Sequence, residues 1–336
     1  MSSVAKKAQA ALLANRKAAY DLSTKKGGDA TRSLLDEAAR ELKQRLMQVE
    51  TTGAGEGSFT AVQMRSTLAQ IEATLATLTG GLTDLLLTEG KRSASKSVRN
   101  QLNYLREADK AFRGVGVQPL ALPEASMMDR AVKNTESSLL RRLVSTPEDT
   151  PEKMGILNRY GVETVGVFEQ RLQQGLLQKK SWIDMRNDLI AESPFLQAEP
   201  VYWAERIVRT ELMGAYNRAG YEAGKVVQEE LGDMLKILAA TFDDRTAADS
   251  YAVHGQIRKP SEAFSDWFHN YLNPPNRPND RETIVWHRMR WELPSYLEPR
   301  SDAEVAARWR KEGRKGSPPA RPLMETVDRS LIGKRS

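Results

Sequence analysis

The placement of proline is the feature that most constrains how this chain can fold. All fifteen prolines lie at or after Pro119, and all six tryptophans lie at or after Trp182. Proline lacks a backbone N–H and clashes with the preceding helical turn, so it breaks helices. The first third of the 336-residue chain contains no proline and is therefore free to form long helices.

Apolar residues in this first third recur at helical spacing. One seam steps by four and three positions through Leu35, Ala39, Leu42, Leu46 and Val49. A glycine-rich stretch, 51–58, separates it from a second seam made by Met64, Leu68, Ile71, Leu75, Leu78, Leu82 and Leu85. Spacing of this kind predicts amphipathic helices.

Local signals suggest where the second of these helices begins and ends. Thr60 and Gln63 have the spacing of a capping box, which marks a helix start. Gly80 and Gly81 are expected to kink or end the helix, because each glycine costs about 1 kcal/mol relative to alanine. A third helical stretch is expected over 98–112. The seams fit either docking against another subunit or an antiparallel hairpin that buries its own seams.

Composition divides the chain into five segments. We expect a heptad-patterned helical region over 1–115, a linker and helix over 116–150, and a helical connector over 151–199. A small α+β module follows over 200–297, with a helix from Pro200 and strands near 236–242 and 284–291. The last segment, 298–336, is expected to be a basic, poorly structured tail. The predicted fold class is mainly α with this small C-terminal α+β module.

Composition also excludes several classes of protein. The chain has no cysteine, so neither disulfides nor thiolate metal sites are possible. No apolar run approaches the ~18 residues that a membrane helix requires. The N-terminus carries charged and polar residues too early for a secretory signal. We therefore expect an intracellular protein without a membrane partner.

The positive charge is concentrated in the tail. The net charge is +6, and residues 300–336 hold ten Lys and Arg against five Asp and Glu. Such a field attracts polyanions, DNA first among them. The candidate DNA- or partner-binding residues are Arg308, Trp309, Arg310, Lys311, Arg314 and Lys315. A solvated tail that only aids solubility is the alternative.

The helix expected from Pro200 to Glu229 carries a narrow stripe of small apolar residues. Alanines at 204, 215, 219 and 223 dominate this stripe, and small side chains let another element approach closely. The helix also contains the run Arg209-Thr210-Glu211, followed by Tyr216-Asn217. We expect Arg209 to be structural, with its guanidinium donating to carbonyls or carboxylates.

A polar turn follows the first expected strand. In Asp243-Asp244-Arg245-Thr246, an aspartate is expected to accept a hydrogen bond from the backbone two residues on. Arg245 can pair with a carboxylate in bidentate fashion, and Gly255 suits a position with positive φ. The turn is interpreted either as a buried polar staple between strand and helix or as a metal or phosphate site.

The three histidines raise the question of a metal. His254, His269 and His287 fall in one window with nearby carboxylates, which is the chemistry of a metallonuclease. No pair has a tight ligand spacing such as His-x-x-x-His. We expect no metal ligand, no cofactor and no catalytic residue.

In this order and spacing, the motifs resemble the phage Mu F-like minor head proteins, also called phage head morphogenesis proteins. The resemblance covers about residues 200–292. It is carried by Arg209-Thr210-Glu211, Tyr216-Asn217, Asp243-Asp244-Arg245-Thr246, Gly255-Gln256, Phe264 and Asn273-Pro274-Pro275. Many members also have a Cys or His after Asp-x-Arg-Thr and an Asn-Cys-Arg-Cys later. Here Ala247, Ser250 and the run 286–290 stand at those places.

The resemblance implies a minor capsid component at or near the portal vertex. Such a protein assists head assembly and DNA packaging, retention or ejection, in the virion and in the host cytoplasm during assembly. The implied partners are portal, coat or scaffold protein and packaged double-stranded DNA, and self-association is left open. The alternatives are a metal-dependent nuclease using Asp243, Asp244, His254 and His287, and a simple DNA-binding protein.

Overall fold

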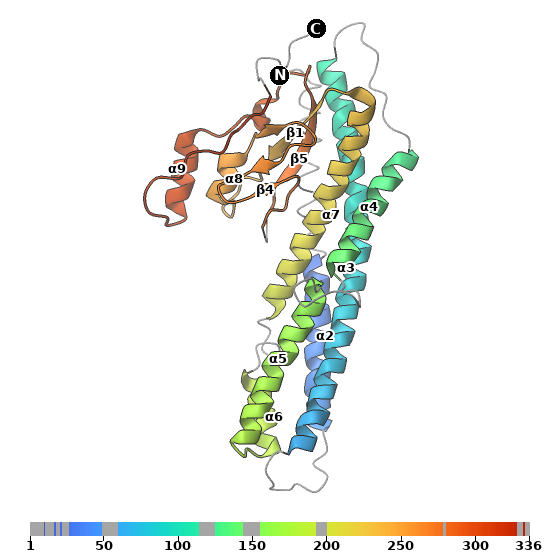
Figure 1. Ribbon diagram of the computed structural model, residues 1–336, viewed down its shortest axis with the longest axis vertical. Helices are drawn as coiled ribbons and strands as arrows, with labels where there is room; N and C mark the ends of the chain where they lie inside the picture. Colours follow the sequence, from blue (N-terminus) through green and yellow to red (C-terminus); the bar gives the residue numbers. More distant parts are fainter. Residues whose placement is uncertain are drawn as a thin grey trace. The chain divides into compact units, whose positions relative to one another are not determined.

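The computed structural model describes residues 10, 17, 21, 27–48, 60–113, 125–143, 155–192, 200–277, 280–327 and 332. The chain is mainly helical with a small sheet near its C-terminal end (Figure 1), which confirms the predicted fold class. The expected breaks at 51–58, 114–123, 146–151 and 193–194 lie outside the described residues. In the part of the chain that is described, no helix is long and apolar enough to cross a membrane.

The fold has two compact units, which are not consecutive stretches of sequence. The helical unit comprises Thr24–Glu89 and Ser137–Arg209, and the sheet unit comprises Met1–Ser23, Gly90–Glu136 and Thr210–Ser336. Three helices, α3 (Ala61–Phe112), α4 (Ala125–Leu143) and α7 (Pro200–Leu231), contribute residues to both. The five segments expected from the sequence therefore do not coincide with the compact units.

The helical unit buries its seams within the chain. Helix α2 (Gly27–Gln48) places Leu35, Leu42 and Leu46 in the interior, and α3 does the same with the series Ile71, Leu75, Leu78, Leu82 and Leu86. The capping box is present, because Thr60 N donates to Gln63 Oε1 (2.9 Å) and Gln63 N donates to Thr60 Oγ1 (3.3 Å). Ala39, Met64, Leu68 and Leu85 of the expected seams are half-buried, and Val49 lies outside the described residues. The middle of each seam is therefore buried within the chain, whereas docking against another subunit stays a prediction.

The expected break at Gly80 and Gly81 is wrong, since α3 continues without interruption for 52 residues. A Cβ at Gly81 would lie 3.3 Å from Leu34 Cδ2 of α2. The glycine therefore permits a close approach between the two helices instead of ending one of them. Packing of this kind offsets the propensity cost of about 1 kcal/mol for each glycine.

A second close approach joins α5 (Ile156–Leu177) and α6 (Trp182–Glu192). A Cβ at Gly175 would lie only 1.9 Å from Met185 Sδ, so the thioether occupies the space that a side chain would fill. Ser181 precedes α6, and its hydroxyl accepts a hydrogen bond from Asp184 N (3.1 Å). Both features fix the turn between the two helices.

The sheet unit contains a three-stranded antiparallel sheet in the order β2-β1-β5. Its strands are β1 (Met234–Ala239), β2 (Ile257–Arg258) and β5 (Thr283–Arg288), and Ile237 pairs with Val285. A separate hairpin joins β3 (Phe264–Ser265) to β4 (Asn270–Tyr271). Strands were expected near 236–242 and 284–291, and both exist with shifted bounds.

Helix α7 packs closely on β5 through its small residues. A Cβ at Gly224 would lie 1.8 Å from the Trp286 ring, and the indole Nε1 donates to Gly220 O (2.9 Å). The expectation that small side chains on this helix admit another element is therefore confirmed. Helix α3 contacts the same strand, because Gln101 Nε2 donates to Ile284 O (2.6 Å).

Short helices complete the sheet unit. They are α8 (Ala248–Val253), the 3-10 turn η4 (Ser295–Leu297) and α9 (Asp302–Lys311). Helix α9 lies in the tail, where composition predicted little structure, and a capping box between Ser301 and Glu304 starts it. After α9 the described tail contains no helix or strand, only a single bridge at Glu325.

Candidate functional site

The first motif arginine belongs to an ion-pair cluster in the helical unit. Arg209 Nη2 donates to Glu205 Oε2 (2.6 Å), and Arg32 Nη2 of α2 donates to the other oxygen, Glu205 Oε1 (2.9 Å). The Glu205 side chain is only 7% exposed. The carboxylate thus joins α2 and α7, and Arg209 has the carboxylate partner expected of a structural arginine.

The next motif residues lie in the sheet unit. Tyr216 is buried and its hydroxyl accepts a hydrogen bond from Asn100 Nδ2 of α3 (3.1 Å). Burial raises the pKa of the Tyr216 hydroxyl well above its usual value. Asn217 is also buried and donates from Nδ2 to Glu282 O (2.9 Å), just before β5. Thr210 is half-buried beside the buried Glu211. These residues therefore fix α7 to its neighbours.

The turn after β1 is an Asx turn closed by an arginine. Asp243 Oδ1 accepts from Arg245 N (2.8 Å), as expected, and Thr246 Oγ1 accepts from Asp243 N (3.0 Å). The bidentate partner of the carboxylate is Arg281, whose Nη2 lies 2.7 Å from Asp243 Oδ1 and whose Nη1 bonds Oδ2. Hydrogen bonding from Arg281 lowers the pKa of Asp243 well below its usual value. Asp243, Asp244 and Arg245 are all exposed, so the expectation of a buried staple at this turn is wrong.

Gly255 has φ +78°, as the sequence predicted. A Cβ there would lie 2.6 Å from Leu297 O, so the position requires glycine for both conformation and space. The neighbouring His254 is buried and bonds backbone on both sides. Its Nδ1 accepts from Ala240 N (3.1 Å), and its Nε2 lies 3.1 Å from Tyr296 O. This histidine therefore links β1 to the segment after β5.

The fold does not bring the three histidines together as a metal site. His287 is buried, with Nε2 3.1 Å from Trp291 O and Nδ1 3.5 Å from the Tyr104 hydroxyl. Burial lowers the pKa of His287 to about 4. His269 is exposed and has Nδ1 3.4 Å from Asp266 Oδ2. Among the described residues, no group of three or more His, Cys, Asp or Glu could hold a metal ion.

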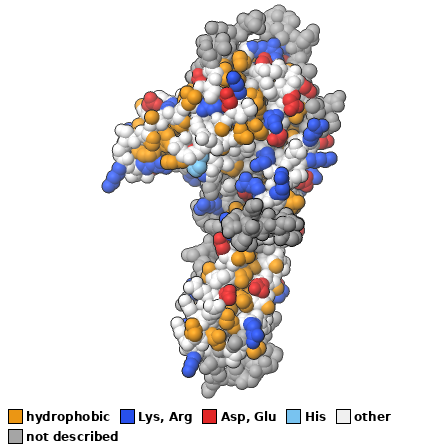
Figure 2. Space-filling view, in the orientation of Figure 1, with side chains coloured by type: hydrophobic (Ala, Val, Ile, Leu, Met, Phe, Trp, Pro, Cys, Tyr) orange, Lys and Arg blue, Asp and Glu red, His pale blue; other side chains and the backbone are white. Residues whose placement is uncertain are grey.

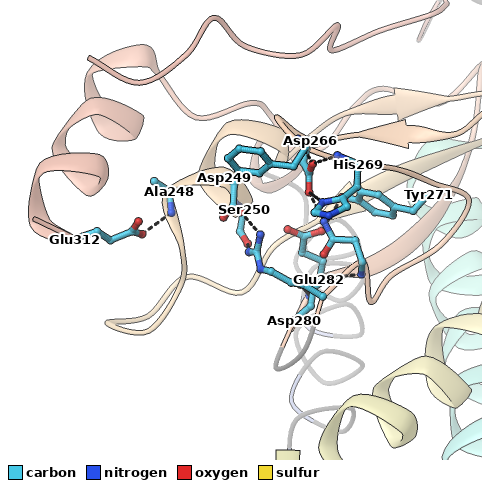
Figure 3. Close-up of polar contacts among 12 residues, drawn as sticks. Ala248, Asp249, Ser250, Asp266, His269, Tyr271, Asp280, Glu282 and Glu312 are labelled. Atoms are coloured by element: carbon cyan, nitrogen blue, oxygen red, sulfur yellow. Dashed lines mark hydrogen bonds and ion pairs between the residues drawn. The ribbon is translucent and has the colours of Figure 1, made fainter. Parts of the chain in front are cut away.

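Sequence reasoning missed a buried polar network around Arg277 (Figure 3). The guanidinium forms an ion pair with Asp249 of α8, and Nη2 donates to Ser250 Oγ (2.8 Å). Close by, Asp280 Oδ1 accepts from Glu282 N (3.1 Å), and Glu282 Oε2 accepts from the Tyr271 hydroxyl (2.9 Å). The network thus joins α8, β4 and the start of β5.

The network holds more carboxylates than cations. Asp280 and Glu282 are 3% and 2% exposed. Burial raises the pKa of Asp280 above its usual value, and burial with the nearby Asp280 charge raises the pKa of Glu282 well above its own. Both shifts reflect several buried carboxyl groups gathered around one guanidinium. Periodicity carries no signal for this arrangement, since its members come from α8, β4 and the loop before β5.

A buried lysine lies on β1. Lys236 is fully buried, donates to Leu272 O (2.8 Å), and lies over the Phe264 and Tyr221 rings at 4.7 and 5.1 Å. Burial lowers the pKa of Lys236 to about 8. The strand pattern at 236–242 suggested no such role, because a lysine in a strand is usually at the surface.

Several of the predicted tail residues already have partners in the sheet unit. Arg308 Nη2 donates to Asp244 O (2.6 Å), and Lys311 Nζ pairs with Asp244 Oδ1 (2.9 Å). Arg314 lies over the Trp309 ring at 4.6 Å and pairs with Glu312 (2.9 Å). Arg310 and Lys315 are exposed. The cationic tail is therefore partly neutralised where α9 meets the Asp243 turn.

Comparison with known proteins adds no relative. No family model, no curated protein and no solved structure matches this chain.

Proposed function

We propose that this chain is a minor head protein of a phage, acting at or near the portal vertex. In this proposal it assists head assembly and DNA packaging, retention or ejection. The main support is that the motif residues from 209 to 256 hold neighbouring segments of the chain together. Asn217 bonds Glu282 O, and Gly255 makes the close turn after α8.

The chemistry of these motif residues favours assembly over catalysis. Tyr216, Asn217 and Thr246 are buried and bond to protein atoms. Asp243 accepts from Arg245 N and Arg281, and its pKa is too low for a general base near neutral pH. The arrangement produces a rigid module that can present its surface to another subunit.

The helical unit offers a surface for a portal, coat or scaffold subunit. Helix α5 exposes apolar side chains at Val162 (58%), Val167 (45%) and Leu177 (82%). Hydrophobic side chains on the surface of this unit are visible in Figure 2. Exposed apolar groups on one helix are typical of contacts with a partner helix. In the sheet unit, Arg310 and Lys315 are the exposed cations we propose for packaged DNA.

The experiment is to co-express this chain with the portal, scaffold and coat genes of the same genome and to sediment the particles. We expect the chain in proheads and heads at few copies per particle. Its absence from both would refute the proposal. Val162→Asp with Leu177→Asp should reduce incorporation without unfolding the chain, because both side chains are exposed.

A cleavage assay separates the enzyme alternative. Purified chain is incubated with duplex DNA and Mg²⁺ or Mn²⁺. Cleavage that is lost in Asp243→Ala and His254→Ala variants would replace the assembly role with a nuclease. We expect no cleavage, because His254 bonds backbone through both ring nitrogens.

A further inference from the structure

The edge of the sheet at β2 is occupied by the chain's own tail. Ile257 N donates to Met324 O (2.8 Å), and Ile257 forms a parallel bridge with Glu325. We call residues 320–327 the docked segment. The segment adds an extended strand to the free side of β2, which is the geometry of β-augmentation.

The site recognises the main chain of the docked segment. Arg258 is 2% exposed, and its Nη1 and Nη2 donate to Met324 O (3.0 Å) and Leu323 O (2.5 Å). Trp267 Nε1 donates to Ala320 O (3.1 Å). The remaining Arg258 contacts, to Ala263 O (2.9 Å), Ile257 O (2.8 Å) and Ser265 Oγ (3.5 Å), hold the guanidinium in place. Side-chain donors of the sheet unit therefore bond three carbonyls of the segment, at Ala320, Leu323 and Met324.

Two side chains anchor the end of the segment. Val327 is 9% exposed and packs in the core of the sheet unit, and the Thr326 hydroxyl bonds Glu262 Oε2. By contrast, Leu323 is 66% exposed. The ligand that fits this site is an extended peptide with free carbonyls and a β-branched apolar residue at its end.

The link between α9 and the docked segment has the features of a hinge. Gly313 and Gly316 have φ of +73° and +76°, and a Cβ added at either position would meet nothing within 4 Å. Pro318 and Pro319 follow, which favour extended chain. Helix α9 itself stays attached to the sheet unit, because Val305 is buried and Glu312 Oε1 accepts from Ala248 N (2.6 Å).

We propose that the β2 edge is a docking site for the docked segment of a second copy of this chain. Every copy carries the same segment and the same donors, so an exchanged segment makes the contacts seen here. Exchange of identical elements is a low-cost route to association. The segment can dock on its own chain or on a second copy. Docking on its own chain is favoured by the short tether, which provides an effective concentration of order mM, so exchange requires a high local concentration of chains.

Cross-linking between two copies tests this proposal on the full chain. The chain has no cysteine, so Glu262→Cys and Thr326→Cys variants each carry one thiol. The two variants, with different tags, are unfolded together at high concentration, refolded and treated with a short bis-maleimide. We expect a cross-linked heterodimer that increases with chain concentration. Val327→Asp in the Thr326→Cys copy should reduce its yield about tenfold, since the buried anchor is lost.

Two controls make the outcome decisive. The Glu262→Cys/Thr326→Cys double variant should cross-link within one chain, which shows that the thiols reach each other. Glu262→Cys mixed with Ala303→Cys, an exposed α9 position outside the docked segment, gives the background. Cross-linking within one chain, together with a heterodimer yield no higher than this background, would overturn the proposal. The result is independent of the proposed role in a phage head.

Discussion

The helical unit and the sheet unit are stabilised by different kinds of contact. In the helical unit, α2 and α3 bury leucines at regular spacing, and hydroxyls such as Thr31 and Thr74 bond carbonyls four residues earlier. In the sheet unit, polar side chains join distant segments, as Asn217 does with Glu282 and Gln101 with Ile284. The first unit depends mainly on periodic apolar burial, whereas the second combines an apolar core with many particular polar partners. Single polar substitutions should therefore affect the sheet unit far more.

The largest difference in stability is expected between loss of a buried ion pair in the sheet unit and loss of an exposed ion pair in the helical unit. Arg277→Ala leaves Asp249, whose side chain is 6% exposed, without its cation beside two other buried carboxylates. We expect a loss of about 3–5 kcal/mol of unfolding free energy, as for other broken buried pairs. Arg45→Ala removes an exposed pair within α2 and should cost about 0.3–0.5 kcal/mol.

Denaturant unfolding measures both changes. Tryptophan fluorescence reports mainly the sheet unit, since four of the six tryptophans lie after residue 210. Similar losses for the two variants would contradict the distinction between the units.

The next prediction concerns how the unfolding free energy changes with pH. The pKa of His287 is lowered by burial from 6.5 to about 4, so the unfolded chain binds the proton more tightly than the folded chain. The stability that this neutral histidine contributes is complete above pH 6.5 and is lost as pH falls towards 4. The shift corresponds to about 3 kcal/mol.

The difference between wild type and His287→Gln isolates this contribution, because Asp280 and Glu282 titrate in both proteins. Carboxyls with raised pKa act in the opposite direction, losing stability as pH rises above their ordinary pKa values, 3.8 for Asp280 and 4.5 for Glu282. Unfolding is measured at pH 7.5, 6, 5 and 4. A difference that does not change with pH would exclude a buried neutral His287. The helical unit has no histidine and serves as the internal reference.

A third prediction compares two helical glycines. Gly224→Ala places a Cβ against Trp286, whereas Gly166→Ala in α5 meets nothing within 4 Å. We expect Gly224→Ala to destabilise by about 2 kcal/mol, because overpacking exceeds the gain in helix propensity. Gly166→Ala should stabilise by up to about 1 kcal/mol. Thermal melts test the opposite signs, and stabilisation by both would show that α7 does not pack closely on β5.

The smallest expected effect is at the two capping boxes. Ser301→Ala in α9 and Thr60→Ala in α3 each remove a side-chain acceptor for a backbone N–H. Each should cost about 1 kcal/mol. Hydrogen exchange should show faster opening of the first turn of the affected helix. A loss of several kcal/mol at Ser301 would mean that α9 supports the rest of the sheet unit.

Most of the helices and both main strands could be predicted because their signals are local, although the stretch 98–112, expected as a third helix, is part of α3. Apolar spacing located α2 and α3, and the Thr60 box located the start of α3. The continuity of α3 through Gly81 could not be predicted, since it depends on Leu34 from another helix. The start of α9 carried a capping signal at Ser301 and Glu304 that the charge of the tail obscured.

Part of the candidate site was also predicted, because its signals are local as well. The Asx turn at Asp243 and the positive φ of Gly255 follow from residue type, and both are present. Arg277, Arg281 and Arg258 were missed, because their partners are brought near only by the tertiary fold. The clustered histidines were a local pattern that the fold separates, with the His254 and His287 rings near backbone carbonyls and the His269 ring beside Asp266.

The most direct measurement for the proposed function is quantitative mass spectrometry of proheads assembled with and without the portal. We expect this chain at few copies in portal-containing proheads and its depletion when the portal is left out. Equal amounts in both would move the partner to coat or scaffold protein. Absence from both kinds of particle would contradict a role in the phage head.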